Sequence, residues 1–155
     1  MSTAGLTSAG ILLWRRREGV LEVLLGHPGG PFFAKKDDWS VLKGEVESGE
    51  DLQAVARREF EEESGTPIAE DAEMIELGEI RQKSGKVVVA WAVEGDLDPA
   101  TAVSNTFELE WPPRSGRTQE FPEIDRVDWF TLENARGKMR AAQVPFLDRL
   151  ERAVG

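Results

Sequence analysis

The sequence contains no cysteine, no tyrosine and a single histidine, His27. The absence of cysteine excludes disulfide bonds, thiolate metal sites and cysteine nucleophiles. A single histidine excludes every site that needs two imidazole ligands, including the HExxH zinc enzymes. Long apolar runs are also missing. The longest, Ile11–Trp14 and Val87–Val93, are far too short to span a bilayer, so no membrane partner is expected.

The N-terminal region lacks the pattern of a secretory signal. Its basic cluster, residues 15–17, follows the first apolar stretch, whereas a signal peptide places its basic residues before the apolar segment. We therefore expect a soluble, cytoplasmic protein.

Basic residues are outnumbered, with 19 lysines and arginines against 29 acidic residues and a net charge of −10. This balance argues against a partner that is a nucleic-acid polymer, because gripping its backbone requires basic patches. It does not exclude binding of phosphates, since a bound divalent cation inverts the local field. The chain has no repeat and no low-complexity segment, and we expect residues 1–155 to form one domain.

The pattern of apolar residues predicts strands and helices in alternation. Strands are expected at residues 8–14, 20–25, 39–42, 74–82, 86–93 and 127–130. Helices are expected at residues 48–64, 131–136 and 142–153. Ser48 and Asp51 match a capping box for the first helix, Gly65 matches its end, and the residues between 93 and 127 predict a long loop. The order indicates an α/β or α+β sandwich around a mixed sheet.

Residues 44–66 carry eight acidic and two basic side chains, so more than half of the net charge lies in this segment. On a helix, Glu59, Glu62 and Glu63 share one face with the apolar residues, whereas Glu61 points the opposite way. Three carboxylates on an inward face repel one another and lose hydration unless a cation neutralises them. A hard divalent cation with oxygen ligands, Mg²⁺ or Mn²⁺, is the natural partner. The alternative is an acidic, solvated helix.

The spacing of the polar and glycine positions in this segment resembles the Nudix box. The matching residues are Gly44, Glu50, Arg58-Glu59-Phe60, Glu62-Glu63 and Gly65. Only the last position departs, where Thr66 replaces the usual aliphatic residue. The resemblance implies a Nudix-like α/β/α sandwich around a mixed β-sheet. It also implies a Mg²⁺- or Mn²⁺-dependent hydrolase of nucleoside diphosphate derivatives. Members are often dimers, so the resemblance allows a homodimer.

The resemblance assigns roles by position. Glu59, Glu62 and Glu63 resemble the metal ligands, and the backbone carbonyl of Gly44 is a further candidate ligand. Glu59 and Glu62 also count as candidate catalytic residues. Arg58 and Glu50 resemble the pair that orients the site. A general base must take a proton from the attacking water, and it is either a helix glutamate or a glutamate of a later loop.

Further candidates lie outside the box. Glu120 resembles a loop glutamate that several members use as metal ligand or base, the alternative being an exposed loop residue. Lys43, Arg114 and Arg117 are candidates for binding substrate phosphates, or are solvated side chains. Trp39 is a candidate surface for stacking a base, or a core residue.

The sequence indicates the type of reaction more clearly than it indicates the substrate. The segment Trp39-Ser40-Val41-Leu42-Lys43-Gly44 resembles the W-x-x-P-K-G motif of dinucleoside polyphosphate hydrolases, with Leu42 in place of the proline. That group commonly carries a tyrosine downstream, which this chain lacks. Ile80 and Arg81 stand where ADP-ribose enzymes tend to carry a proline. We expect a pyrophosphohydrolase of nucleoside polyphosphates, with the dinucleoside kind slightly favoured. The alternatives are a MutT-like NTP or dNTP pyrophosphatase and a non-catalytic nucleotide-binding domain.

Overall fold

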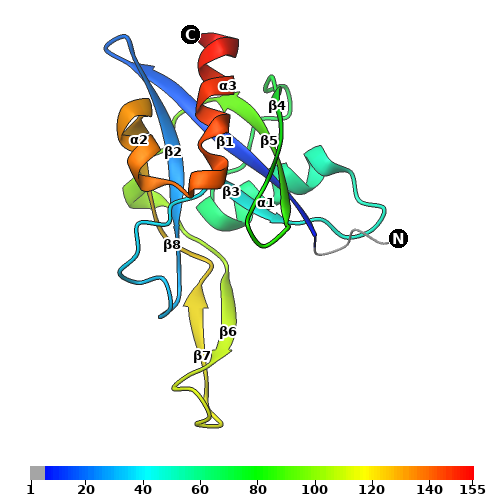
Figure 1. Ribbon diagram of the computed structural model, residues 1–155, viewed down its shortest axis with the longest axis vertical. Helices are drawn as coiled ribbons and strands as arrows, with labels where there is room; N and C mark the ends of the chain where they lie inside the picture. Colours follow the sequence, from blue (N-terminus) through cyan, green and yellow to red (C-terminus); the bar gives the residue numbers. More distant parts are fainter. Residues whose placement is uncertain (1–5) are drawn as a thin grey trace.

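A computed structural model describes residues 6–155 and contains a six-stranded mixed sheet with helices on both faces (Figure 1). The strands are β1 (Thr7–Arg17), β2 (Val20–Pro28), β3 (Leu42–Glu45), β4 (Ile75–Arg81), β5 (Val87–Glu94), β6 (Thr106–Glu110), β7 (Thr118–Pro122) and β8 (Ile124–Thr131). The helices are α1 (Leu52–Ser64), α2 (Leu132–Lys138) and α3 (Pro145–Val154), with short 3₁₀ turns η1 (Pro99–Thr101) and η2 (Ala141–Gln143).

The main sheet has the order β4-β5-β1-β2-β8, and β3 pairs with β1. Strand β1 is long enough to pair with two strands along one edge. Its first half pairs with β3 and its second half with β2, and both pairings are antiparallel. On its other edge β1 runs parallel to β5, whereas the remaining pairs are antiparallel. The prediction of a mixed sheet is therefore confirmed.

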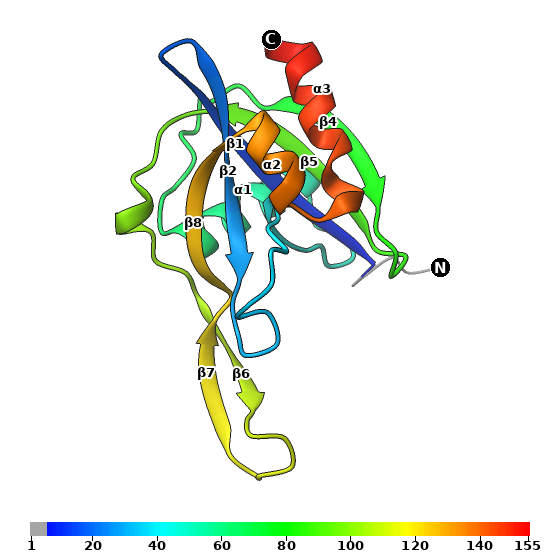
Figure 2. The same ribbon diagram turned by 60° about the vertical axis from the view of Figure 1, so that its left-hand side comes forward.

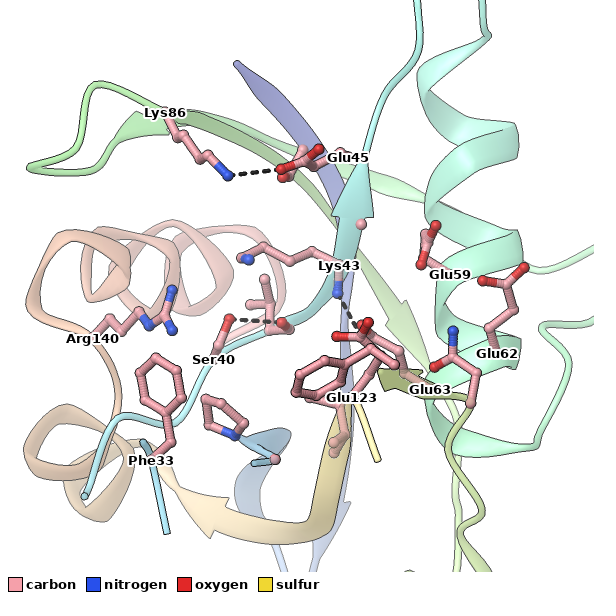
Figure 3. Close-up of a pocket in the computed structure, with 18 residues that line it drawn as sticks. Phe33, Ser40, Lys43, Glu45, Glu59, Glu62, Glu63, Lys86, Glu123 and Arg140 are labelled. Atoms are coloured by element: carbon pink, nitrogen blue, oxygen red, sulfur yellow. Dashed lines mark hydrogen bonds and ion pairs between the residues drawn. The ribbon is translucent and has the colours of Figure 1, made fainter. Parts of the chain in front are cut away.

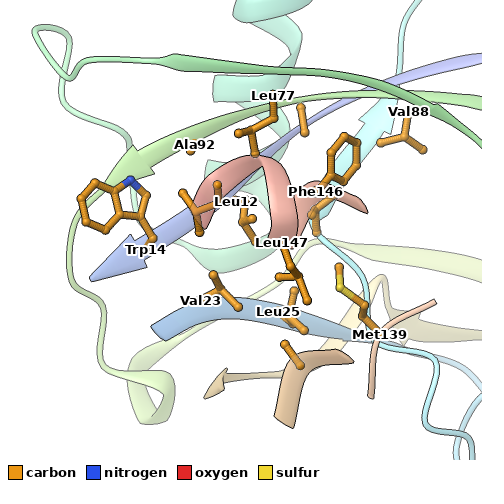
Figure 4. Close-up of a cluster of buried hydrophobic side chains, with 14 of the residues drawn as sticks. Leu12, Trp14, Val23, Leu25, Leu77, Val88, Ala92, Met139, Phe146 and Leu147 are labelled. Atoms are coloured by element: carbon orange, nitrogen blue, oxygen red, sulfur yellow. The ribbon is translucent and has the colours of Figure 1, made fainter. Parts of the chain in front are cut away.

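The two faces of the sheet bury separate hydrophobic clusters, as the alternation of side chains along the strands requires. Helix α1 covers one face, and α2 and α3 cover the other (Figures 1 and 2). Phe60 of α1 is 1% exposed, and Phe146 and Leu147 of α3 are fully buried against the sheet (Figure 4). This arrangement confirms the α/β/α sandwich.

Helix α1 begins later than predicted. It starts at Leu52, because Asp51 is itself the N-cap and its carboxylate accepts a hydrogen bond from the Ala54 N–H at 3.0 Å. The capping box with Ser48 is therefore wrong: a helix begins where its exposed N–H groups first find an acceptor, here Asp51. The predicted end at Gly65 is confirmed, and Gly65 has the left-handed φ of 79°.

Two further segments differ from the sequence expectation. The short strand β3 lies at Leu42–Glu45 rather than at residues 39–42, so Gly44 is a strand residue beside α1. The predicted long loop contains a β-hairpin, in which β6 and β7 pair with Phe107 opposite Phe121. This hairpin projects from the main sheet (Figures 1 and 2), and its alternating pattern was hidden by the Pro-Pro turn at its end. Within residues 6–155, no helix has the length and apolar character needed to cross a membrane.

Candidate active site

A pocket of about 520 Å³ opens where the end of α1, strand β3 and the segment after β7 meet (Figure 3). A volume of this size suits a small-molecule ligand. Its walls include five carboxylates, three basic side chains and two phenylalanines. These residues are Glu45, Glu59, Glu62, Glu63, Glu123, Lys43, Lys86, Arg140, Phe33 and Phe107.

Helix α1 supplies the acidic wall. Its sequence places Glu59, Glu62 and Glu63 within one turn, and all three line the pocket. Glu63 is 7% exposed, and its carboxylate accepts a hydrogen bond from the backbone N–H of Lys43 at 3.0 Å. Glu62 is the most exposed of the three, at the mouth of the pocket. The helix therefore forms the predicted cluster, with the deepest carboxylate anchored to β3.

The approach of β3 to α1 explains the glycine at position 44. A Cβ atom on Gly44 would lie 2.0 Å from the Glu59 carboxyl carbon, far inside van der Waals contact. Glycine lets the backbone of β3 pass directly against the Glu59 carboxylate. The strand and the helix thus form one continuous oxygen-rich surface.

Burial perturbs the acidic wall. Loss of hydration raises the pKa of Glu63 to about 8, and Glu59 adds to this effect while Lys43 opposes it. Burial also raises the pKa of Glu59, with a further contribution from Glu62. Burial likewise raises the pKa of Glu123, against the effect of Lys43. These carboxylates are costly to ionise without a cation.

Arg58 ties the acidic wall to the preceding loop. Its Nη1 donates to the Glu50 carboxylate at 2.8 Å, and the guanidinium lies 3.7 Å from Glu59 and 3.9 Å from Glu62. The other oxygen of Glu50 accepts from the Glu47 N–H at 2.8 Å. The contact between Arg58 and Glu50 expected from the sequence is present, and it fixes the loop against α1.

Gln143 supports the opposite side of the pocket from within the core. Its side chain is fully buried, accepts a hydrogen bond from the Val41 N–H at 3.0 Å and donates to the Ser40 hydroxyl at 3.0 Å. Both partners belong to the segment that leads into β3. This buried amide therefore holds the pocket wall in place.

Four of the sequence candidates lie elsewhere. Trp39 is 5% exposed and packs in the core against His27 and Phe130, so it presents no free face to a base. Arg114 and Arg117 lie in the turn that ends the β6–β7 hairpin and do not line the pocket.

Glu120 is an exposed residue of β7, opposite Glu108, and it does not line the pocket either. Glu123 does line it, three residues further on. The Glu123 N–H donates to the Asn105 carbonyl, and its own carbonyl accepts from the Gly29 N–H, each at 2.9 Å. These bonds bring Glu123 back to the main body after the hairpin.

Two other wall residues, Arg140 and Phe33, were not among the sequence candidates. Each comes from a segment without a recognisable motif, so only the tertiary contacts could identify them. Glu123, by contrast, stood three residues from a candidate, and the hairpin register would have distinguished the two.

The donor set of the pocket matches a hard divalent cation, because it consists of carboxylate oxygens and the neighbouring backbone of Gly44. It contains no sulfur ligand and no imidazole. In the part of the chain that the structure describes, no three acidic or histidine side chains lie close enough together to hold an ion as they stand. The chemistry of the residues fits a hard divalent cation, which would offset the cost of ionising the buried Glu63.

Comparison with known proteins agrees with the fold. The family model for the NUDIX domain matches residues 6–150. The chain therefore belongs to the NUDIX domain family, and it is a Nudix-type hydrolase that acts on phosphorus-containing acid anhydrides. No curated protein sequence matches it.

Solved structures with the same fold share little sequence with this chain. A C. elegans Ap4A hydrolase in a binary complex has a TM-score of 0.67 and 22% identity, over 95% of this chain and 97% of that chain. The NUDIX domain of Shewanella oneidensis NrtR complexed with ADP ribose has a TM-score of 0.65 and 15% identity, over 97% of this chain and 88% of that chain. A mutT/nudix family protein from Listeria innocua has a TM-score of 0.63 and 17% identity, over 98% of this chain and 95% of that chain.

Proposed function

We propose that this protein, acting as one domain, is a Mg²⁺- or Mn²⁺-dependent pyrophosphohydrolase that cleaves a phosphoanhydride bond in a nucleoside polyphosphate. The observation that carries the proposal is the pocket whose acidic wall is formed by α1, with Glu63 buried at its base beside β3. Bare carboxylates on this wall repel the phosphates of an anionic substrate. A pocket of this kind therefore suits a phosphate compound that arrives together with divalent cations.

Glu59, Glu62, Glu63 and the Gly44 carbonyl would hold the cation. When bound, it supplies the positive charge that draws phosphate oxygens to this wall and makes an attacking water more acidic. Arg58, held by Glu50, keeps the helix carboxylates and the preceding loop in register.

Glu123 is the loop residue we assign to take the proton from the attacking water. It is an exposed residue that lines the pocket, and backbone hydrogen bonds of its N–H and carbonyl hold it there. Burial raises the pKa of its carboxyl, which makes its ionised form a stronger base than a solvated glutamate. This role replaces the one that the sequence suggested for Glu120.

For the substrate, the lead-in from Trp39 to Gly44 favours dinucleoside polyphosphates, and the structural likeness to an Ap4A hydrolase is compatible with this choice. That likeness supports the fold alone at 22% identity. The cytoplasmic location and a homodimer remain predictions from the sequence.

The test is a hydrolysis assay with Mg²⁺ or Mn²⁺ and a panel of diadenosine polyphosphates, nucleoside triphosphates, ADP-ribose and NADH. We expect turnover of at least one polyphosphate, its loss in EDTA, and its recovery when the metal is returned. Glu62→Gln should reduce kcat strongly. Absence of turnover with every compound would point to a binding domain, and a clear preference for triphosphates would favour a MutT-like enzyme.

A matched pair of variants tests the base. Glu123→Gln should lower kcat about 100-fold or more, the usual contribution of a general base, with little change in KM. Glu120→Gln, an equivalent change on the exposed strand, should keep kcat within about twofold. Equal effects of the two substitutions would contradict the role of Glu123.

A further inference from the structure

The pocket has a second wall of opposite charge. Lys43 extends from β3 away from α1, toward Arg140 on the far side of the cavity (Figure 3). Within residues 6–155, the Lys43 ammonium forms no hydrogen bond or ion pair with another side chain. Lys86 is paired with Glu45 at 2.7 Å, whereas Lys43 and Arg140 are not paired with the α1 carboxylates.

Arg140 is held in place from several directions. Its Nε donates to the Asp38 carboxylate at 3.0 Å, its backbone N–H donates to the Trp39 carbonyl at 2.9 Å, and its own carbonyl accepts from the Gln143 N–H at 2.9 Å. The guanidinium carbon lies 5.9 Å from the centre of the Phe33 ring. In the described part of the chain, neither Nη group has a hydrogen-bond partner.

Two cations on one wall are an unfavourable arrangement unless an anion joins them. Asp38 offsets part of the Arg140 charge but bonds only its Nε. The Lys43 ammonium loses hydration in the pocket and is repelled by Arg140, while Glu63 and Glu45 offset part of that repulsion. A phosphate group placed between them would meet both cations, and the fork of Arg140 suits two phosphate oxygens at once.

We propose that Arg140, together with Lys43, binds a phosphate group of the substrate that is not part of the bond being cleaved. This rests on the proposed function, which puts the scissile phosphoanhydride at the acidic wall. Both phosphates of that bond are then engaged near α1, and only a further phosphate reaches across to Arg140. The wall therefore selects nucleotides with three or more phosphates over diphosphate compounds such as ADP-ribose.

Arg140→Met tests this selection, because methionine keeps an aliphatic stem over Phe33 and removes the charge. For a tri- or tetraphosphate substrate we expect KM to rise about tenfold with kcat within about twofold, the loss typical of a charge-assisted hydrogen bond. The KM for ADP-ribose, or its inhibition constant when it is used as a competitor, should change by less than about twofold. Arg140→Lys should recover part of the affinity. Arg152→Met, on the exposed side of α3, is the matched control.

A binding measurement without catalysis separates this inference from the proposed function. Inorganic tripolyphosphate is titrated into metal-free protein at low salt by calorimetry. Wild type should bind it, and Arg140→Met and Lys43→Met should each weaken binding about tenfold. Unchanged affinity in both variants would overturn the inference even if the enzyme hydrolyses nucleotides. Arg140-dependent binding with no turnover of any nucleotide would instead refute the proposed function and leave the anion site standing.

Discussion

Glu63 offers a direct test of the acidic wall through stability rather than activity. The side chain is 7% exposed, and its carboxylate accepts the Lys43 N–H at 3.0 Å. Glu63→Gln removes the ionisable group but retains an amide oxygen that accepts the same hydrogen bond. The substitution therefore changes the charge and leaves the shape of the site nearly intact.

The magnitude follows from the pKa of Glu63, which burial raises from 4.5 to about 8. Between these values the metal-free folded protein retains a proton that the unfolded chain has released. The raised pKa therefore leaves stability unaffected below about pH 4.5, reduces it progressively as the pH rises toward 8, and has its full effect above. At 1.36 kcal/mol per unit, the penalty at pH 8 is on the order of 4 kcal/mol. Glutamine does not ionise and escapes this penalty.

The assay is thermal unfolding of metal-free protein from pH 5 to pH 8.5. Near pH 5 the two proteins should melt at similar temperatures, and at pH 8 Glu63→Gln should melt higher by on the order of ten degrees. Adding Mg²⁺ should raise the Tm of wild type more than that of the variant. Glu61→Gln, on the exposed face of α1, is the control and should have the same melting temperature as wild type at each pH. Equal melting temperatures of Glu63→Gln and wild type at pH 8 would refute a buried, uncompensated carboxylate.

Two further substitutions test the geometry around this wall. Gly44→Ala puts a Cβ 2.0 Å from the Glu59 carboxyl carbon, so it should lower kcat at least tenfold and cost roughly 1–3 kcal/mol of stability. Gly137→Ala, where a Cβ meets nothing within 4 Å, is the control and should leave kcat unchanged in the hydrolysis assay. Gln143→Leu leaves the buried Val41 N–H without its acceptor and should cost about 1–3 kcal/mol in urea unfolding. A stability equal to wild type would show that this N–H finds another partner.

The sequence predicted the acidic wall well because that wall is local. Glu59, Glu62 and Glu63 lie within one turn of a single helix, so the helical period alone places them on the face that meets the sheet. Glu50 lies outside this helix, but it is only eight residues from Arg58 in the chain. No long-range information was needed for any of these positions.

The rest of the site depends on contacts between segments distant in the chain. Arg140 reaches the pocket because its backbone bonds to the Trp39 carbonyl, a pairing that no local pattern encodes. Glu123 rather than Glu120 lines the pocket because the β6–β7 hairpin has a definite register and rejoins the main body at residue 123. A shift of one to three residues along the hairpin decides which carboxylate enters the pocket. The spacing of residues in a segment expected to be a loop does not reveal that shift.

The net charge of −10 has a different meaning once the pocket is known. Charges on the outer surface are screened within about 8 Å at physiological ionic strength, whereas those in a confined pocket act on a ligand at contact distance. A nucleic-acid polymer must approach along the surface and meets the acidic exterior. A small nucleotide that enters the pocket meets Lys43 and Arg140 directly, and any cation held by α1 adds to their attraction. The same chain can therefore disfavour polymers and still bind a polyphosphate, because the two ligands sample different parts of its electrostatic field.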